Sequence, residues 1–122
     1  MRKLVLLLLP MLLLACQSEE FRQVSYFKSD HNFRVFVYAV PDGTDLDAIK
    51  KHAEQRMYTE GSTTAVYYYT ESTLESLKYD ISTASDAFQA QDLACTQGCI
   101  VGYWKFPTGK VSFIENPCVE TE

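Results

Sequence analysis

The chain has 122 residues, with 11 basic and 16 acidic side chains, a formal net charge of −5 and four cysteines. This length suffices for one small domain and excludes two. An acidic chain without a cluster of lysines and arginines lacks the charge that binding to DNA or RNA requires, so we expect no nucleic-acid partner.

The N-terminus carries the first recognisable element. Arg2 and Lys3 precede an uncharged, mostly apolar run from Leu4 to Leu14. As a helix this run would be about 17 Å long, whereas the hydrocarbon core of a membrane is about 30 Å thick. We therefore interpret residues 1–15 as a signal peptide rather than a transmembrane helix. Its removal takes away both basic residues and changes the net charge from −5 to −7.

The end of this segment reads Leu13-Leu14-Ala15-Cys16 and resembles the lipobox of bacterial lipoproteins. The resemblance implies cleavage before Cys16, a diacylglyceryl group on its thiol and usually an acyl group on its new amino group. Together these acyl chains exceed what stable anchoring in a membrane requires. The alternatives are a plain secretory leader with a coincidental cysteine and a short uncleaved anchor. We expect covalent lipid on Cys16 and no other cofactor.

The residue after the cysteine bears on the membrane in which the protein resides. In lipoproteins an aspartate at this position favours retention in the inner membrane, and the residue here is Gln17. The resemblance therefore implies a cell-envelope protein, anchored in the outer membrane and facing the periplasm in preference to the inner membrane.

The mature chain divides into a tether and a domain. We expect residues 16–32 to form a lipidated tether with a candidate edge strand over 21–27, and residues 33–122 to form the domain. Runs of β-branched and aromatic residues predict further strands over residues 33–40, 63–70, 100–106 and 110–116.

Two helices are predicted from apolar residues that recur at intervals of three and four. The first follows Thr44, and its stripe is Leu46, Ile49, Ala53 and Met57. The second runs over about residues 72–92, and its stripe is Leu74, Leu77, Ile81, Ala84 and Phe88.

The order strand, helix, strand, helix, strand, strand predicts an α+β fold. A right-handed crossover should make the first two of these strands parallel neighbours. The economical arrangement is a two-layer sandwich, a mixed sheet of four to five strands with both helices on one face. Its core would include Val35, Val37, Val66, Trp104 and Phe113.

Three consecutive tyrosines, Tyr67, Tyr68 and Tyr69, are the most unusual feature of the domain. Successive side chains of a strand point to opposite faces. If the helices cover one face only, Tyr67 and Tyr69, with Tyr38 or Tyr103, form a candidate binding face for a sugar or a protein. The alternative is ordinary strand packing, because tyrosine has a high β-propensity.

Candidate groups for catalysis or metal binding are few. His31 and His52 lack the spacing of a zinc motif, and we expect both to be solvated. The acidic segment from Asp42 to Asp47 differs from a calcium loop in the place of its glycine and in its twelfth residue. A turn followed by the start of a helix explains these aspartates, so we expect no metal site.

The three cysteines that remain after lipidation suggest one disulfide in an oxidising compartment. A two-residue turn at Thr108-Gly109 would place Trp104 opposite Phe113 and Cys99 opposite Cys118, at a distance suited to a bridge. We therefore predict a Cys99–Cys118 disulfide that contributes about 2–3 kcal/mol. The other pairings are Cys95–Cys118 and Cys95–Cys99.

These features favour a lipid-anchored module that acts by binding rather than by catalysis. Its partner would be another envelope protein, peptidoglycan or an incoming toxin. The alternative is a small envelope enzyme in which Cys95 is the nucleophile and His31 or His52 the base, which requires the two groups within hydrogen-bond reach in a cleft.

Overall fold

The computed structural model describes residues 21–77, 80–96 and 98–116. These ranges contain, in chain order, the elements β1 (Arg22–Lys28), β2 (Arg34–Val40), α2 (Leu46–Glu54), β3 (Thr64–Thr70), α3 (Glu71–Ser76), the 3-10 helix η1 (Ile81–Thr83), α4 (Ala87–Thr96), β4 (Val101–Lys105) and β5 (Val111–Glu115). The predicted signal peptide, Cys16, Gln17 and Cys118 lie outside the described residues.

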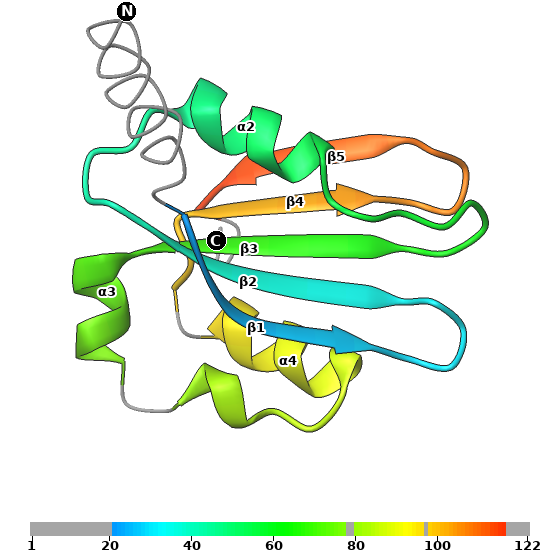
Figure 1. Ribbon diagram of the computed structural model, residues 1–122, viewed down its shortest axis with the longest axis horizontal. Coiled ribbons are helices and arrows are strands. Elements are labelled where there is room, and N and C mark those ends of the chain that lie inside the picture. Colours follow the sequence, from blue (N-terminus) through cyan, green and yellow to red (C-terminus); the bar gives the residue numbers. More distant parts are fainter. Residues whose placement is uncertain (1–20, 78–79, 97, 117–122) are drawn as a thin grey trace, which may run out of the picture.

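The strands form one mixed sheet whose order follows the sequence, from β1 at one edge to β5 at the other (Figure 1). β2 and β3 are parallel and are joined through α2, and the other neighbouring pairs are antiparallel. This confirms the predicted α+β class and the mixed sheet with its parallel pair. The candidate edge strand is confirmed as β1, so the fold includes residues that the sequence assigns to the tether.

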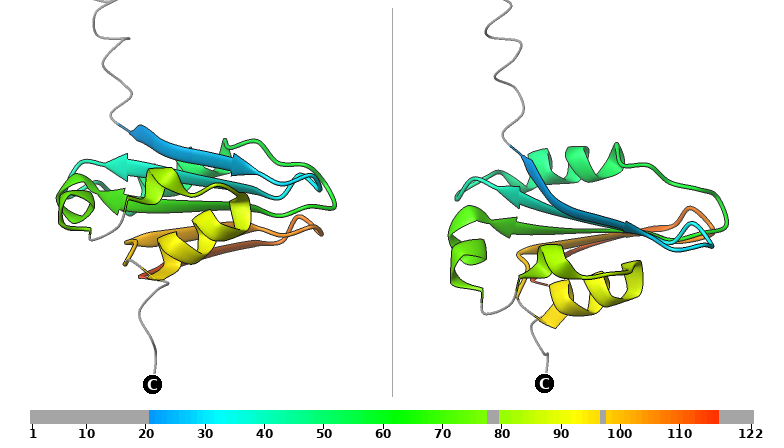
Figure 2. Two further views of the ribbon diagram at one scale, coloured as in Figure 1. Left: turned by 90° about the horizontal axis from the view of Figure 1, so that it is seen from below. Right: turned by 60° about the horizontal axis from the view of Figure 1, so that its bottom comes forward.

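Helices cover both faces of the sheet, with α2 on one face and η1 and α4 on the other (Figure 2). The sequence predicts both helices on one face, and the placement differs because β2 is buried along its whole length. A strand without a polar face needs apolar cover on both sides. Of the predicted core residues, Val35, Val37 and Trp104 pack on the α4 side, and Val66 and Phe113 on the α2 side.

α2 is attached to the sheet by a narrow apolar stripe. Ile49 and Ala53 are its buried residues, whereas Leu46 is 39% exposed and Met57, which follows the end of the helix, is 64% exposed. A helix of nine residues depends on such tertiary packing for its stability. Because the stripe is narrow, polar side chains of α2 also meet the sheet, and His52 is one of them.

The second predicted helix is divided into three pieces. Asp80 accepts a hydrogen bond from the backbone N–H of Ser82 (2.9 Å), and Asp86 accepts one from the N–H of Gln89 at the start of α4 (2.7 Å). Short polar side chains that bond nearby backbone in this way compete with a continuous helix. One result is that Phe88, which the helical stripe places in the core, is 75% exposed.

The hairpin of β4 and β5 is confirmed, but its predicted register is wrong by one residue. Tyr103 lies opposite Phe113, and Trp104 lies opposite Ser112. The N–H of Phe106 donates to the carbonyl of Lys110 (2.8 Å), so the loop between them has three residues instead of two. Three-residue hairpin loops place their last residue in the left-handed region, and here Gly109, with φ of 87°, occupies it.

This register also removes the geometric reason for the predicted disulfide. The pairing continues to Ile100, whose carbonyl accepts a hydrogen bond from the N–H of Asn116 (2.8 Å). Cys99 is therefore no longer aligned with Cys118 by the hairpin. Because Cys118 lies outside the described residues, the Cys99–Cys118 bridge stays a prediction.

Candidate functional site

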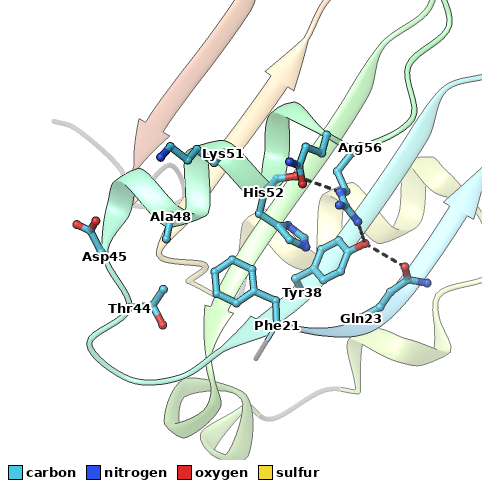
Figure 3. A pocket seen from close by; sticks show the side chains of 10 residues that line it. Phe21, Gln23, Tyr38, Thr44, Asp45, Ala48, Lys51, His52 and Arg56 are labelled. Atoms are coloured by element: carbon cyan, nitrogen blue, oxygen red, sulfur yellow. Dashed lines mark hydrogen bonds between the residues drawn. The ribbon is translucent and has the colours of Figure 1, made fainter. Parts of the chain in front are cut away.

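A hollow of about 810 Å³ lies between α2 and the adjoining parts of β1 and β2. Figure 3 shows side chains from the start of β1, from β2, and from α2 with the loops on either side of it converging there. The lining residues are Phe21, Gln23, Tyr38, Thr44, Asp45, Ala48, Lys51, His52, Gln55 and Arg56. Pockets that combine ring surfaces with a few placed polar groups are typical of ligand sites.

Arg56 is held in this hollow by hydrogen bonds from two of its nitrogens. Its Nη1 donates to the hydroxyl of Tyr38 (2.7 Å), and its Nε donates to the backbone carbonyl of His52 (3.1 Å). The guanidinium carbon also lies 5.4 Å from the centre of the Tyr38 ring, within the range of a cation–π contact. The Tyr38 hydroxyl in turn donates to Oε1 of Gln23 (3.1 Å), so Tyr38 links the segment after α2 to β1.

His52 is packed among aromatic rings. Its ring centre lies 4.4 Å from that of Tyr38 and 4.8 Å from that of Phe21, both in edge-on arrangements. Its Nδ1 is 2.8 Å from the hydroxyl of Tyr68. Burial, and after it the charge of Arg56, lowers the pKa of His52 from 6.5 to about 4. The imidazole is therefore neutral at neutral pH.

The hydrogen bond to Tyr68 decides which nitrogen of His52 carries the proton. Burial raises the pKa of Tyr68 above its ordinary value, so its hydroxyl stays protonated. Within the described part of the chain, Nδ1 of His52 is the only partner of that hydroxyl. A buried hydroxyl without an acceptor is costly, so we assign the Tyr68 proton to this bond and the imidazole proton to Nε2.

The hollow contains a cation without a matching anion. Over residues 21–77, 80–96 and 98–116, no carboxylate lies within 4.0 Å of Arg56. The ion pair in these ranges joins Arg22 to Glu71 (2.9 Å), and neither residue lines the hollow. Lys51, in the last turn of α2, and Asp45, at the start of α2, also line the hollow. Asp45 directly precedes the first residue of α2, and at 1.5 Å per residue it lies roughly 16 Å from Arg56 along the direction of the helix.

The predicted tyrosine binding face is wrong. Tyr67, Tyr69 and Tyr103 are only 1%, 0% and 3% exposed. Tyr67 and Tyr69 face α4, whereas Tyr103 faces α2, so the three do not share a surface. The alternative of strand packing is confirmed for them, because both faces of the sheet are covered. Tyr38, the other tyrosine weighed for that face, lines the hollow instead.

The residues proposed for the enzyme alternative occupy separate elements. His31 is exposed in the turn between β1 and β2, and His52, predicted to be solvated, is half-buried in the hollow. The backbone of Cys95 belongs to α4, on the face of the sheet opposite α2. The structure therefore does not bring Cys95 and His52 together.

Within the acidic segment before α2, Asp42 has a structural role. Oδ1 of Asp42 accepts a hydrogen bond from the backbone N–H of Ser72 (3.2 Å), and Asp45 is the residue that precedes the first turn of α2. In the described ranges no three His, Cys, Asp or Glu side chains are grouped so as to hold a metal ion.

Sequence reasoning did not identify Phe21, Gln23 or Arg56 as site residues. One signal was available, because His52 and Arg56 are four residues apart and such pairs lie on the same side of a helix. Phe21 and Gln23 carried no comparable signal, since their position depends on how β1 pairs with β2.

Two further observations concern the chain as a whole. None of the helices in the described ranges has the length and apolar character needed to cross a membrane. Comparison with protein-family models, curated proteins and solved structures gave no match.

Proposed function

We propose that this chain is a lipid-anchored protein of the bacterial cell envelope that acts by binding, without catalysis, and that the hollow beside α2 is its binding site. The lipobox resemblance at Cys16 supports the anchor, and Gln17 supports the outer membrane with the domain facing the periplasm. The ligand in this setting comes from peptidoglycan or another envelope protein.

The observation that carries this proposal is the state of Arg56. Removing a guanidinium from water without a counter-ion is unfavourable, yet this one is fixed by Tyr38 and the carbonyl of His52 beside ring surfaces. A cation that is held in place but has no carboxylate partner is better suited to binding a ligand than to stabilising the fold. The neutral imidazole of His52 adds a second polar group to the same hollow.

Site-specific photo-crosslinking in living cells tests the proposed site. Ala48 is exposed and lines the hollow, whereas Thr108 is exposed in the loop between β4 and β5. We expect a p-benzoyl-phenylalanine at position 48 to give light-dependent adducts, detected as mass shifts of the purified chain, and the same residue at position 108 to give none. Adding Arg56→Met should remove most of the adduct.

The matched control for this variant is Lys28→Met, which removes the same charge from an exposed position of β1 outside the hollow. It should leave the adduct at position 48 unchanged. Adducts at neither position, or equal adducts at both, would refute the hollow as the binding site.

A further inference from the structure

The remaining hydrogen-bonding capacity of Arg56 indicates what the hollow binds. A guanidinium has five N–H groups, and two are used, one from Nε to His52 and one from Nη1 to Tyr38. Three N–H groups remain, one on Nη1 and two on Nη2, the two nitrogens that form the outer edge of the guanidinium. Two parallel N–H groups along such an edge match the two oxygens of a carboxylate.

The balance of charge in the hollow favours a ligand with one negative charge. Its charged lining residues are Arg56, Lys51 and Asp45, and with His52 neutral they leave one net positive charge. A phosphate monoester carries nearly two negative charges at pH 7, which a single guanidinium does not balance. A carboxylate carries one.

The side chains next to Arg56 favour a ligand that also has an apolar group. The ring of His52 lies edge-on against those of Phe21 and Tyr38, and of these three rings Phe21 and His52 are partly exposed. Because His52 is neutral, its ring provides apolar surface together with the N–H of Nε2, which has no hydrogen-bond partner among the described residues. A ligand group packed on these rings is removed from water, which favours binding.

We propose that the hollow binds a monocarboxylate with an apolar group beside the carboxylate, as at the carboxyl terminus of a short peptide. The carboxylate pairs with the outer edge of Arg56, and the apolar group packs on the partly exposed rings of Phe21 and His52. This inference rests on the proposed function and specifies the chemical class of ligand that the hollow takes.

A matched pair of probes tests the inference on the full mature chain in detergent. N-acetyl-phenylalanine carries the carboxylate and the apolar group, and N-acetyl-phenylalanine amide has nearly the same shape without the charge. From the affinity usual for ligands of about this size, we expect the acid to bind with a Kd of about 1 mM. We expect the acid to shift the NMR amide signals of Ala48 and His52, and the amide to bind at least about tenfold more weakly.

Two variants extend the test. Arg56→Met should weaken binding of the acid by about tenfold or more, and Lys28→Met, with the same change of net charge, by less than about twofold. The acid–amide comparison uses the unaltered chain, so a folding defect in Arg56→Met does not affect it.

The outcomes separate this inference from the proposed function. Equal binding of acid and amide at the hollow would overturn the carboxylate preference and leave the binding site standing. Absence of shifts from either probe at about ten times the expected Kd would also overturn the inference, and the crosslinking at position 48 would then decide the proposed function by itself.

Discussion

Replacing Cys16 by serine is expected to abolish both lipid attachment and removal of the signal peptide. The lipobox resemblance implies that lipid is attached to the thiol of Cys16 before the signal peptide is removed, so Cys16→Ser should take up no labelled palmitate and should remain an uncleaved precursor. Palmitate labelling and the mass of the purified chain measure both effects.

Cys118→Ser is the matched control, because it removes another cysteine thiol and should leave palmitate uptake and cleavage unchanged. Normal cleavage of Cys16→Ser would contradict the lipoprotein assignment and would support the plain secretory leader. Loss of palmitate uptake in both variants would show that the label does not report on Cys16.

Replacing Tyr67 by alanine should destabilise the fold severely. Tyr67 is 1% exposed and packs edge-on against Trp104 at 5.6 Å between ring centres. Its hydroxyl also accepts a hydrogen bond from Nε1 of Trp104 (3.1 Å). Removing a buried aromatic ring leaves a cavity, and we expect a loss of about 3–5 kcal/mol in the free energy of unfolding, measured by denaturant titration of the mature chain.

Tyr26→Ala is the control, since Tyr26 is 39% exposed on the edge strand β1. It should cost about 1 kcal/mol or less. If Tyr67 belonged to an exposed binding face, as the sequence suggests for one arrangement of the helices, the two variants would lose similar, small amounts. Such a result would contradict the position of Tyr67 under α4.

Local sequence patterns predicted the elements better than their arrangement. Runs of β-branched and aromatic residues located the strands to within about one residue, because strand propensity is expressed locally. Which side chains of those strands are exposed and which are buried was not predictable in the same way. Tyr67 and Tyr69 suit both an exposed platform and a core, and the choice depends on α4, which packs on them from another part of the chain.

The remaining differences also arise from local competition or distant contacts. Side-chain caps at Asp80 and Asp86 interrupt a helix that the apolar spacing alone would continue. The hairpin register changed by one residue because its loop closes between Phe106 and Lys110. The hollow was missed because its residues come from the start of β1, from β2 and from α2 with its flanking loops, and only the fold brings these segments together.

The proposed binding site depends on the arrangement of His52, Tyr68 and Arg56, and this arrangement has consequences for stability. Because the folded chain favours the neutral imidazole, the stability that His52 contributes is complete above pH 6.5 and is lost as the pH falls toward 4. One pKa unit corresponds to about 1.4 kcal/mol. Since solvent screens this half-exposed ring, we expect the loss to be about 1–2 kcal/mol. His52→Asn keeps an acceptor for Tyr68 and should lack this part of the pH dependence.

The most direct test is an NMR titration of the His52 ring nitrogens in the full mature chain, with His31 in its exposed turn as the internal comparison. We expect an apparent pKa of about 4 for His52. At neutral pH we expect the proton on Nε2, with Nδ1 accepting the hydrogen bond from Tyr68. A His52 that titrates near 6.5, with both ring nitrogens exchanging as they do in a solvated histidine, would contradict the described site.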